Sequence, residues 1–219
     1  MYRTVWLLIG SLLLWSCQSG AEKTVEASTM LPYYNEPTFT PLFLSAPEEI
    51  EAGITHKISP FKLLNQDSLL LDQHWIEGKI HVASFIFTTC GSICPTMVQQ
   101  MQSVSKAFEK DDRVGLLSFS VTPWYDTPAV MQAFKKSYEI SDPNWHFLTG
   151  KQSEIYQLAR QAYFAEEDIG YSRDSTDFLH TEHLILVDAD KRIRGIYNGT
   201  LALDVQQLIA DIYCLRKTL

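Results

Sequence analysis

Cys90 and Cys94 are separated by three residues, and Pro95 follows the second cysteine directly. Because proline is favoured in the first turn of a helix, the pair is predicted to lie where a helix begins. The free backbone N–H groups and the positive partial charge at a helix start favour a thiolate over a thiol, and Cys94 is expected to be the more acidic of the two. Two sulfurs on such a tight loop can bind one soft metal ion or join in a disulfide, and each state excludes the other.

The spacing of the pair separates several kinds of cysteine chemistry. Thioredoxin-type oxidoreductases have two residues between their cysteines and a proline opposite the pair, just before the next core strand. This chain has three intervening residues, and residues 171–187 contain no proline but two histidines, His180 and His183. Because side chains alternate along a strand, His183 is expected to point away from the face of His180 and to take no part. Three roles therefore remain for Cys90 and Cys94: binding a metal ion, cycling as a redox pair, and forming a structural disulfide.

The N-terminus has the pattern of an export signal. Arg3 precedes about eleven mostly apolar residues, a run too short to span a bilayer core, which needs about 20. Residues 14–17, Leu-Trp-Ser-Cys, resemble the lipobox of bacterial lipoproteins, although tryptophan is unusual there. The resemblance implies a signal peptide at 1–16, a lipidated Cys17, and a body in the cell envelope that is lipid-anchored to a membrane and faces the periplasm.

Composition and charge limit the domain organisation and the partners that the rest of the chain can have. Residues 17–50 are polar and punctuated by prolines, so a flexible tether is expected there, followed by one domain at 51–219. The chain has 219 residues, 46% of them hydrophobic and 20% charged, and about 150 ordered residues can bury a sizeable core without disulfides. The net charge of −8 leaves no basic excess to neutralise phosphates, which argues against a nucleic-acid partner.

The body alternates runs typical of strands and of helices. Strands are expected at 80–87, 114–121, 145–148, 184–187 and 193–197, after a hairpin at 61–71, and helices at 95–109, 127–138, 152–164 and 203–215. This order predicts an α/β fold, a mixed β-sheet with helices on both faces and an N-terminal hairpin added. The run at 80–87 is nearly continuous in β-formers and indicates a strand covered on both faces. Ligand sites in such sheets tend to form beyond the carboxyl ends of strands, where Cys90 and Cys94 fall.

Four stretches together resemble the SCO/SenC family. They are residues 87–95 around the cysteines, residues 120–128 after the next strand, Leu148-Thr149-Gly150, and residues 178–181. The family consists of membrane-anchored, thioredoxin-fold proteins that deliver copper to cytochrome c oxidase. The resemblance runs from about residue 58 to 215 and implies a thioredoxin-like fold with copper ligation by Cys90, Cys94 and His180. Two thiolates suit Cu(I), and an added imidazole makes a site that can also hold Cu(II).

The chain departs from the family pattern beside two of these ligands. Gly91 stands where the family usually has proline, which loosens the loop without removing a ligand. Leu179 stands where an aspartate usually precedes the histidine. A carboxylate that orients the His180 imidazole is therefore expected from Asp177 or Glu182.

A third departure lies in the loop after the second long strand. Thr122 and Tyr125 replace the aspartate and the arginine of the family's Asp-Pro-x-Arg-Asp-Thr stretch, a change that bears on partner docking or redox tuning more than on the fold. Trp124 and Tyr125 are large aromatic side chains in this loop. A partner surface and packing in the core are both compatible with their position.

Other chemically capable residues are expected to be structural. Met97 and Met101 have helical spacing with neighbouring apolar residues, which favours core packing over a methionine copper site. Cys214 lies on the apolar-rich final helix and is expected to be a buried small hydrophobe. The remaining histidines are scattered and suggest no second metal site: His56, His74, His81 and His146.

The leading hypothesis is a lipid-anchored periplasmic copper chaperone, not an enzyme, that binds one copper through Cys90, Cys94 and His180. Its expected partners are the copper-site subunit of cytochrome c oxidase or other copper-assembly proteins. The enzyme alternative is a thiol-disulfide oxidoreductase that uses the cysteine pair to reduce the cysteines of the oxidase copper site. A peroxide-reducing enzyme is disfavoured, because Phe87 and Gly91 stand where such enzymes have proline and a threonine or serine. A binding module without metal or redox function would leave the cysteine pair without a role.

Overall fold

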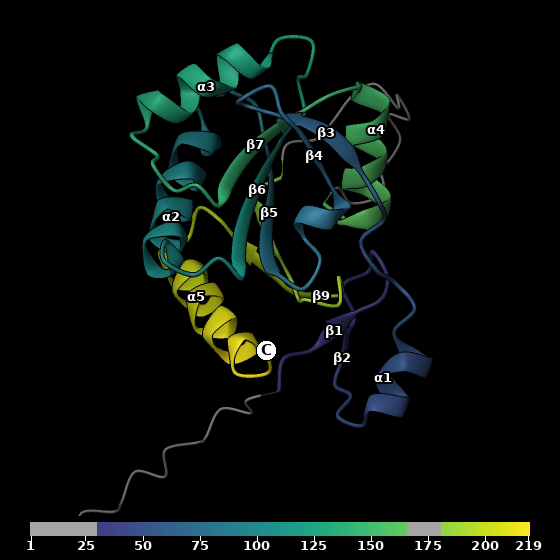
Figure 1. Cartoon of the computed structure of the whole chain (residues 1–219). Helices are drawn as coiled ribbons and strands as arrows, with labels where there is room; N and C mark the ends of the chain where they lie inside the picture. The colour runs from purple at the N-terminus through teal and green to yellow at the C-terminus, as the bar shows by residue number, and fades with distance from the viewer. Residues whose placement is uncertain (1–29, 166–180) are drawn as a thin grey trace, which may run out of the picture.

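The computed structural model describes residues 30–165 and 181–219. In these residues a single mixed sheet has the strand order β2-β1-β9-β8-β5-β6-β7-β3-β4 (Figure 1). The strands are β1 (Tyr33–Tyr34), β2 (Pro41–Leu42), β3 (Lys62–Asn65), β4 (Leu70–Asp72), β5 (Ile80–Ile86), β6 (Val114–Ser120), β7 (Trp145–Thr149), β8 (His183–Val187) and β9 (Ile193–Asn198). Three residues of the predicted site, Cys17, Asp177 and His180, lie outside the described residues.

The centre of the sheet places the ends of two strands side by side. β5, β6 and β7 are parallel, and Ile86 at the end of β5 pairs with Ser120 at the end of β6. β5 and β6 are buried along their whole length, as expected for strands covered on both faces. Because parallel strands end at the same edge, the loops that follow β5 and β6 meet there.

Helices cover both faces of the sheet (Figure 1). The helices are α1 (Pro47–Gly53), α2 (Ile93–Phe108), α3 (Pro128–Ser137), α4 (Gln152–Gln157) and α5 (Ala202–Arg216). Side chains of α2, α3 and α5 share one apolar core, and α4 contributes to a second core on the opposite face. This arrangement confirms the predicted mixed sheet with helices on both faces. Across residues 30–165 and 181–219, none of the helices has both the length and the apolar character that a membrane crossing requires.

Two of the predicted helices differ from the observed ones by more than one residue at an end. α2 begins at Ile93, two residues before Pro95, because Cys94 and Met97 lie three residues apart and are both buried against the sheet. Pro95 is tolerated there because the first N–H groups of a helix have no partner within it. The helix expected at 152–164 is α4 followed by a π-helical turn, Leu158–Ala162. Met97 and Met101 are buried, which confirms their expected role in the core.

Part of the expected tether is packed against the domain. β1 pairs with β9 through Tyr34 and Ile193, and β2 pairs with β1 at the edge of the sheet. Helix α1 follows before residue 54. The prediction of a flexible tether reaching residue 50 is therefore wrong from residue 30 onward.

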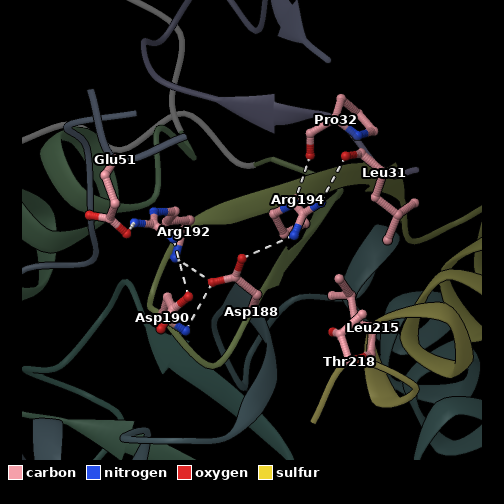
Figure 2. Close-up of polar contacts among 9 residues, drawn as sticks. All are labelled: Leu31, Pro32, Glu51, Asp188, Asp190, Arg192, Arg194, Leu215 and Thr218. Carbon is pink, nitrogen blue, oxygen red and sulfur yellow. Dashed lines mark hydrogen bonds and ion pairs between the residues drawn. The ribbon is translucent and has the colours of Figure 1, made fainter. Parts of the chain in front are cut away.

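Arg194 of β9 holds the beginning of this segment (Figure 2). Its guanidinium donates hydrogen bonds to the carbonyl oxygens of Leu31 at 2.7 Å and Pro32 at 2.9 Å, and it pairs with Asp188 at 3.1 Å. The same guanidinium lies over the ring of Tyr33, 3.7 Å from its centre. A buried arginine thus satisfies its donors with backbone carbonyls, which is why a segment without hydrophobic periodicity is held in place.

The neighbouring arginine joins helix α1 to the same hairpin. Arg192 forms ion pairs with Glu51 of α1 and with Asp190 of the turn between β8 and β9 (Figure 2). Hydrogen bonding to Arg192 lowers the pKa of the Glu51 carboxyl. Both arginines therefore use their planar, multi-donor groups to connect the N-terminal segment to a turn about 140 or more residues away in sequence.

Candidate metal centre

The cysteine pair lies where β5 passes into α2. Residues 87–92 form the connecting loop, with Cys90 half-buried in it and Cys94 buried in the first turn of α2. Cys94 is 3% exposed, and both cysteines are free thiols. The pair therefore lies beyond the carboxyl end of β5 at the start of a helix, as the sequence predicts.

The two thiols have opposite acidities. Burial raises the pKa of the Cys90 thiol, but hydrogen bonds to its sulfur from the backbone amides of Cys94, Ser92 and Ile93 and from the Cys94 thiol outweigh burial and lower the pKa overall. For Cys94, burial dominates and raises the pKa to about 12, and the negative charges of Cys90 and Asp126 act in the same direction.

The expectation that Cys94 is the more acidic cysteine is therefore wrong. The amides at the start of α2 do stabilise a thiolate, but their hydrogen bonds go to the sulfur of Cys90 in the preceding loop. Cys94 itself turns into the apolar core beside Met97, where a charged sulfur loses its hydration. Position along the helix does not predict which thiol is more acidic, because the direction of each side chain decides which sulfur lies near the amides.

The two sulfurs are placed to share one ion. Each thiol contributes to the pKa shift of the other, so the two sulfurs lie close enough to interact. Loss of the thiol protons turns the same two atoms into adjacent soft ligands, the kind that Cu(I) prefers. The donor set therefore fits a copper ion, and the half-buried Cys90 leaves one side of the pair accessible.

A buried carboxylate stands beside the pair. Asp126, in the loop after β6, is 0% exposed and accepts hydrogen bonds from the hydroxyls of Thr88, Ser120 and Thr122 and from the backbone amide of Thr88. Thr88 and Asp126 lie within the family-like stretches at residues 87–95 and 120–128, but no sequence pattern predicted the contact between them. A signal for this contact is present in the sequence. The loop after β6 has one acidic residue, and it lies at the same edge of the sheet as the Thr-rich cysteine loop.

The histidine part of the site is only partly within the described residues. Glu182, one of the two carboxylates expected to orient His180, accepts a hydrogen bond from the side chain of Asn198 at 3.3 Å. His183 begins β8, and its ring contacts the ring of Phe39 edge to face, with centres 6.0 Å apart. Residues 30–165 and 181–219 contain no cluster of three histidine, cysteine or acidic side chains placed to hold a metal ion. His180 remains the predicted third ligand.

Trp124, Tyr125 and Cys214 are all more exposed than core residues. Trp124 and Tyr125 are 65% and 53% exposed, so the alternative of core packing is wrong for both. They lie in the loop after β6, at the same edge of the sheet as the cysteine loop. Cys214 on α5 is half-buried instead of fully buried, because its position on the helix lies between the exposed Tyr213 and the buried Leu215.

Comparisons with known proteins agree with this geometry. The SCO1/SenC family profile matches residues 51–216. The chain is 32% identical to the SCO1 protein homolog of Bacillus subtilis over 175 residues, which covers 78% of this chain and 90% of that protein.

Two solved structures extend the comparison to the fold. BsSco, a member of the Sco family of cytochrome c oxidase assembly proteins in which a disulfide switch was identified, matches with a TM-score of 0.62 and 31% identity over 73% of this chain and 93% of that one. ScoI of Bradyrhizobium japonicum with copper bound matches with a TM-score of 0.58 and 26% identity over 74% of this chain and 99% of that one. The fold is thioredoxin-like, and the chain belongs to the SCO1/SenC family.

Proposed function

We propose that this protein is a copper chaperone that binds one copper ion through Cys90, Cys94 and His180 and delivers it to cytochrome c oxidase during assembly. The observation that carries the proposal is the placement of two free, mutually interacting thiols, Cys90 and Cys94, where β5 passes into α2. Two adjacent thiolates and one imidazole make a ligand set that suits both copper oxidation states.

The exposures of the two sulfurs suit delivery. Cys94 is buried and hydrogen-bonded, so it retains its position whether or not a metal is bound. Cys90 is half-buried in a loop, where a ligand of a partner protein can approach and replace it. Because both thiols must lose their protons to bind copper, and the pKa of Cys94 is high, we expect the apparent copper affinity to rise with pH.

The relatives support the same activity. ScoI of Bradyrhizobium japonicum has been solved with copper bound, and BsSco belongs to a family of cytochrome c oxidase assembly proteins. The exposed Trp124 and Tyr125 lie at the edge of the sheet that carries the cysteines, where a partner approaching Cys90 would contact them. We propose that this partner is the copper-site subunit of the oxidase or another copper-assembly protein.

We further propose that the protein works on a membrane of the cell envelope. Residues 1–16 would be removed as a signal peptide, Cys17 would carry the lipid, and the domain would face the periplasm. Two or more acyl chains anchor a protein firmly, whereas one chain binds only reversibly. Metabolic labelling with a radioactive fatty acid tests the anchor, because Cys17→Ser abolishes incorporation if Cys17 is the lipidated residue.

Copper titration of the reduced, purified full chain in detergent tests the function. We expect one copper per chain and a Cu(II) thiolate charge-transfer band that is lost in Cys90→Ser and Cys94→Ser and is altered or lost in His180→Ala. Cys214→Ser and His183→Ala are the matched controls and should bind copper as the wild type does. The proposal fails if the wild type binds no copper, or if the two cysteine substitutions leave binding unchanged.

The thiol-disulfide oxidoreductase is retained as the second candidate, because the Cys90 thiol has a lowered pKa and lies against a second thiol. In this reaction Cys90 attacks the disulfide of a client, and Cys94 then displaces the client's thiol to leave a Cys90–Cys94 disulfide. Reduction of a peptide with the paired cysteines of an oxidase copper site would be followed by mass spectrometry. Rapid reduction by a wild-type chain that binds no copper would make this the main function.

A further inference from the structure

The carboxylate of Asp126 connects the two loops that meet at the cysteine edge of the sheet. Thr88 lies in the loop after β5, two residues before Cys90, and it donates to Asp126 through both its hydroxyl and its backbone amide, the latter at 3.3 Å. From the other loop, Ser120 donates its hydroxyl at 2.6 Å and Thr122 at 3.0 Å. One fully buried side chain thus fastens the cysteine loop to the end of β6.

The contacts next to Thr88 carry this restraint to both sulfurs. Phe87, which precedes Thr88, accepts a hydrogen bond from the backbone amide of Cys90 at 3.2 Å. The backbone of Phe87 also acts to lower the pKa of the Cys94 thiol, against the larger effect of burial, so it lies near that sulfur. The segment that Asp126 holds therefore contacts both members of the pair.

The charge of Asp126 has no cationic partner among the residues that the structure describes. All four donors to its carboxylate are neutral groups, and within residues 30–165 and 181–219 no lysine, arginine or histidine forms an ion pair with it. A buried negative charge acts over a longer range than an exposed one, because little water screens it. It therefore opposes any additional negative charge in the reduced cysteine pair.

We propose that Asp126 is a positioning residue of the Cys90–Cys94 pair, which holds the two sulfurs adjacent through Thr88 and shifts their dithiol–disulfide equilibrium toward the disulfide. Two effects act in this direction. Fixing the loop raises the effective concentration of one sulfur at the other, and the buried charge disfavours an anionic reduced pair while leaving the neutral disulfide unaffected. This inference is linked to the proposed function only because both concern the same cysteine pair.

Equilibration of the full chain with glutathione in detergent tests the proposal. In this reaction the dithiol and one glutathione disulfide give the Cys90–Cys94 disulfide and two molecules of reduced glutathione, so thiols and electrons balance. The oxidised fraction at a series of glutathione ratios is counted by alkylation and mass spectrometry of the cysteine peptide. No copper is added, so failure of copper binding and failure of this inference are separate results.

Asp126→Asn removes the charge and retains a side chain of the same shape. The amide oxygen can replace Oδ2, which accepts from the Thr88 amide and from the Ser120 and Thr122 hydroxyls, and the Thr88 hydroxyl can rotate to accept from the amide nitrogen. We expect the equilibrium constant for disulfide formation to fall by about three- to tenfold, and a tenfold change corresponds to about 30 mV for this two-electron couple. Thr88→Val retains the charge of Asp126 and removes one hydroxyl, so it should lower the constant by less, and Thr88→Ser should restore the wild-type value.

Asp142 offers a matched control at the opposite edge of the sheet. It is also buried, accepts a hydrogen bond from the Ser105 hydroxyl at 2.6 Å, and precedes the amino end of β7. Asp142→Asn should lower the melting temperature without moving the thiol equilibrium. The proposal is overturned if Asp126→Asn stays within twofold of the wild type or if Asp142→Asn shifts the equilibrium equally. Should Asp126→Asn fail to fold, equal values for Thr88→Val and Thr88→Ser would overturn it.

Discussion

The backbone amide and the thiol of Cys94 both donate hydrogen bonds to the sulfur of Cys90. The buried Cys94 therefore stabilises the thiolate of the half-buried Cys90, while its own thiol stays protonated. This division of roles leaves Cys90 to react first with an incoming ion, client or reagent. It also predicts how the two thiols differ in solution.

Alkylation with iodoacetamide should modify Cys90 before Cys94. Because the thiolate is the reacting form, we expect Cys90 to react at least about tenfold faster near pH 7. The Cys90 rate should rise at lower pH than that of a simple peptide thiol, whereas Cys94, with a pKa of about 12, should not respond over the stable range of the protein.

Mass spectrometry of the cysteine peptide at several reaction times measures both rates. Cys90→Ser is the informative variant, because the remaining Cys94 should stay unmodified until the protein unfolds. Equal rates for the two thiols in the folded wild type would contradict the assigned acidities.

A buried histidine should make stability depend on pH. His81 on β5 is fully buried, its Nε2 lies 3.0 Å from the hydroxyl of Tyr163, and burial lowers its pKa to about 3. The unfolded chain takes up a proton near pH 6.5 and the folded chain does not, so stability is complete above that pH and is lost as the pH falls below it. His81 should thereby cost about 2 kcal/mol at pH 5 relative to pH 8.

Urea unfolding at pH 8 and pH 5 measures this loss. The double variant His81→Leu with Tyr163→Phe removes the histidine without leaving a buried hydroxyl unpaired, and its stability should depend less on pH by the same amount. A pH dependence identical to that of the wild type would show that His81 is protonated in the folded protein.

The same substitution at two glycines should have opposite effects. A Cβ on Gly115 of β6 would overlap the indole of Trp75, so Gly115→Ala should destabilise the protein by about 1–3 kcal/mol. A Cβ on Gly91 would meet no atom within 4 Å. Gly91→Ala should therefore raise stability by about 0.4–1 kcal/mol, because alanine restricts the unfolded chain more than glycine does.

Thermal and urea unfolding of the two variants provide the comparison. Gly91 also lies next to Cys90, so copper stoichiometry of Gly91→Ala is measured in parallel and should stay at the wild-type value. A destabilised Gly91→Ala would indicate that the cysteine loop requires a backbone conformation that alanine does not adopt.

Arg194 should control how firmly the N-terminal segment is held. Arg194→Met removes the hydrogen bonds to Leu31 and Pro32 and leaves the buried carboxylate of Asp188 without its cation. We expect a loss of about 3 kcal/mol in unfolding free energy, because one partner of a buried pair remains uncompensated. Limited proteolysis should also cut between residues 30 and 45 sooner than in the wild type.

Arg113→Met is the control for loss of an arginine. Arg113 pairs with Asp111, but its side chain is 46% exposed, so its removal should change stability by less than about 1 kcal/mol. If the two variants lose the same stability and are cut at the same rate, the contacts of Arg194 do not secure the segment.

Local patterns were sufficient for the central elements. The continuous apolar run at 80–87 and the helical stripe through Met97 and Met101 predicted β5 and α2, because burial on both faces of a strand or on one face of a helix leaves a direct periodic trace. The position of the cysteines beyond β5 followed from the same reasoning. The family-like motifs added a copper role that periodicity alone does not carry.

Contacts between distant residues decided the rest. β1 has two residues and no periodicity, and its place depends on Ile193 and Arg194, which lie about 160 positions later. The acidities of the cysteines depended on the direction of each side chain, since burial of Cys94 outweighs the effect of the helix start. The contact of Asp126 with Thr88 joins two loops that meet only because β5 and β6 are parallel. The sequence by itself thus determined the central strands and helices and the place of the cysteine pair between β5 and α2. The tertiary structure decided the hydration, packing and charge around the pair, because each depends on neighbours that are remote along the chain.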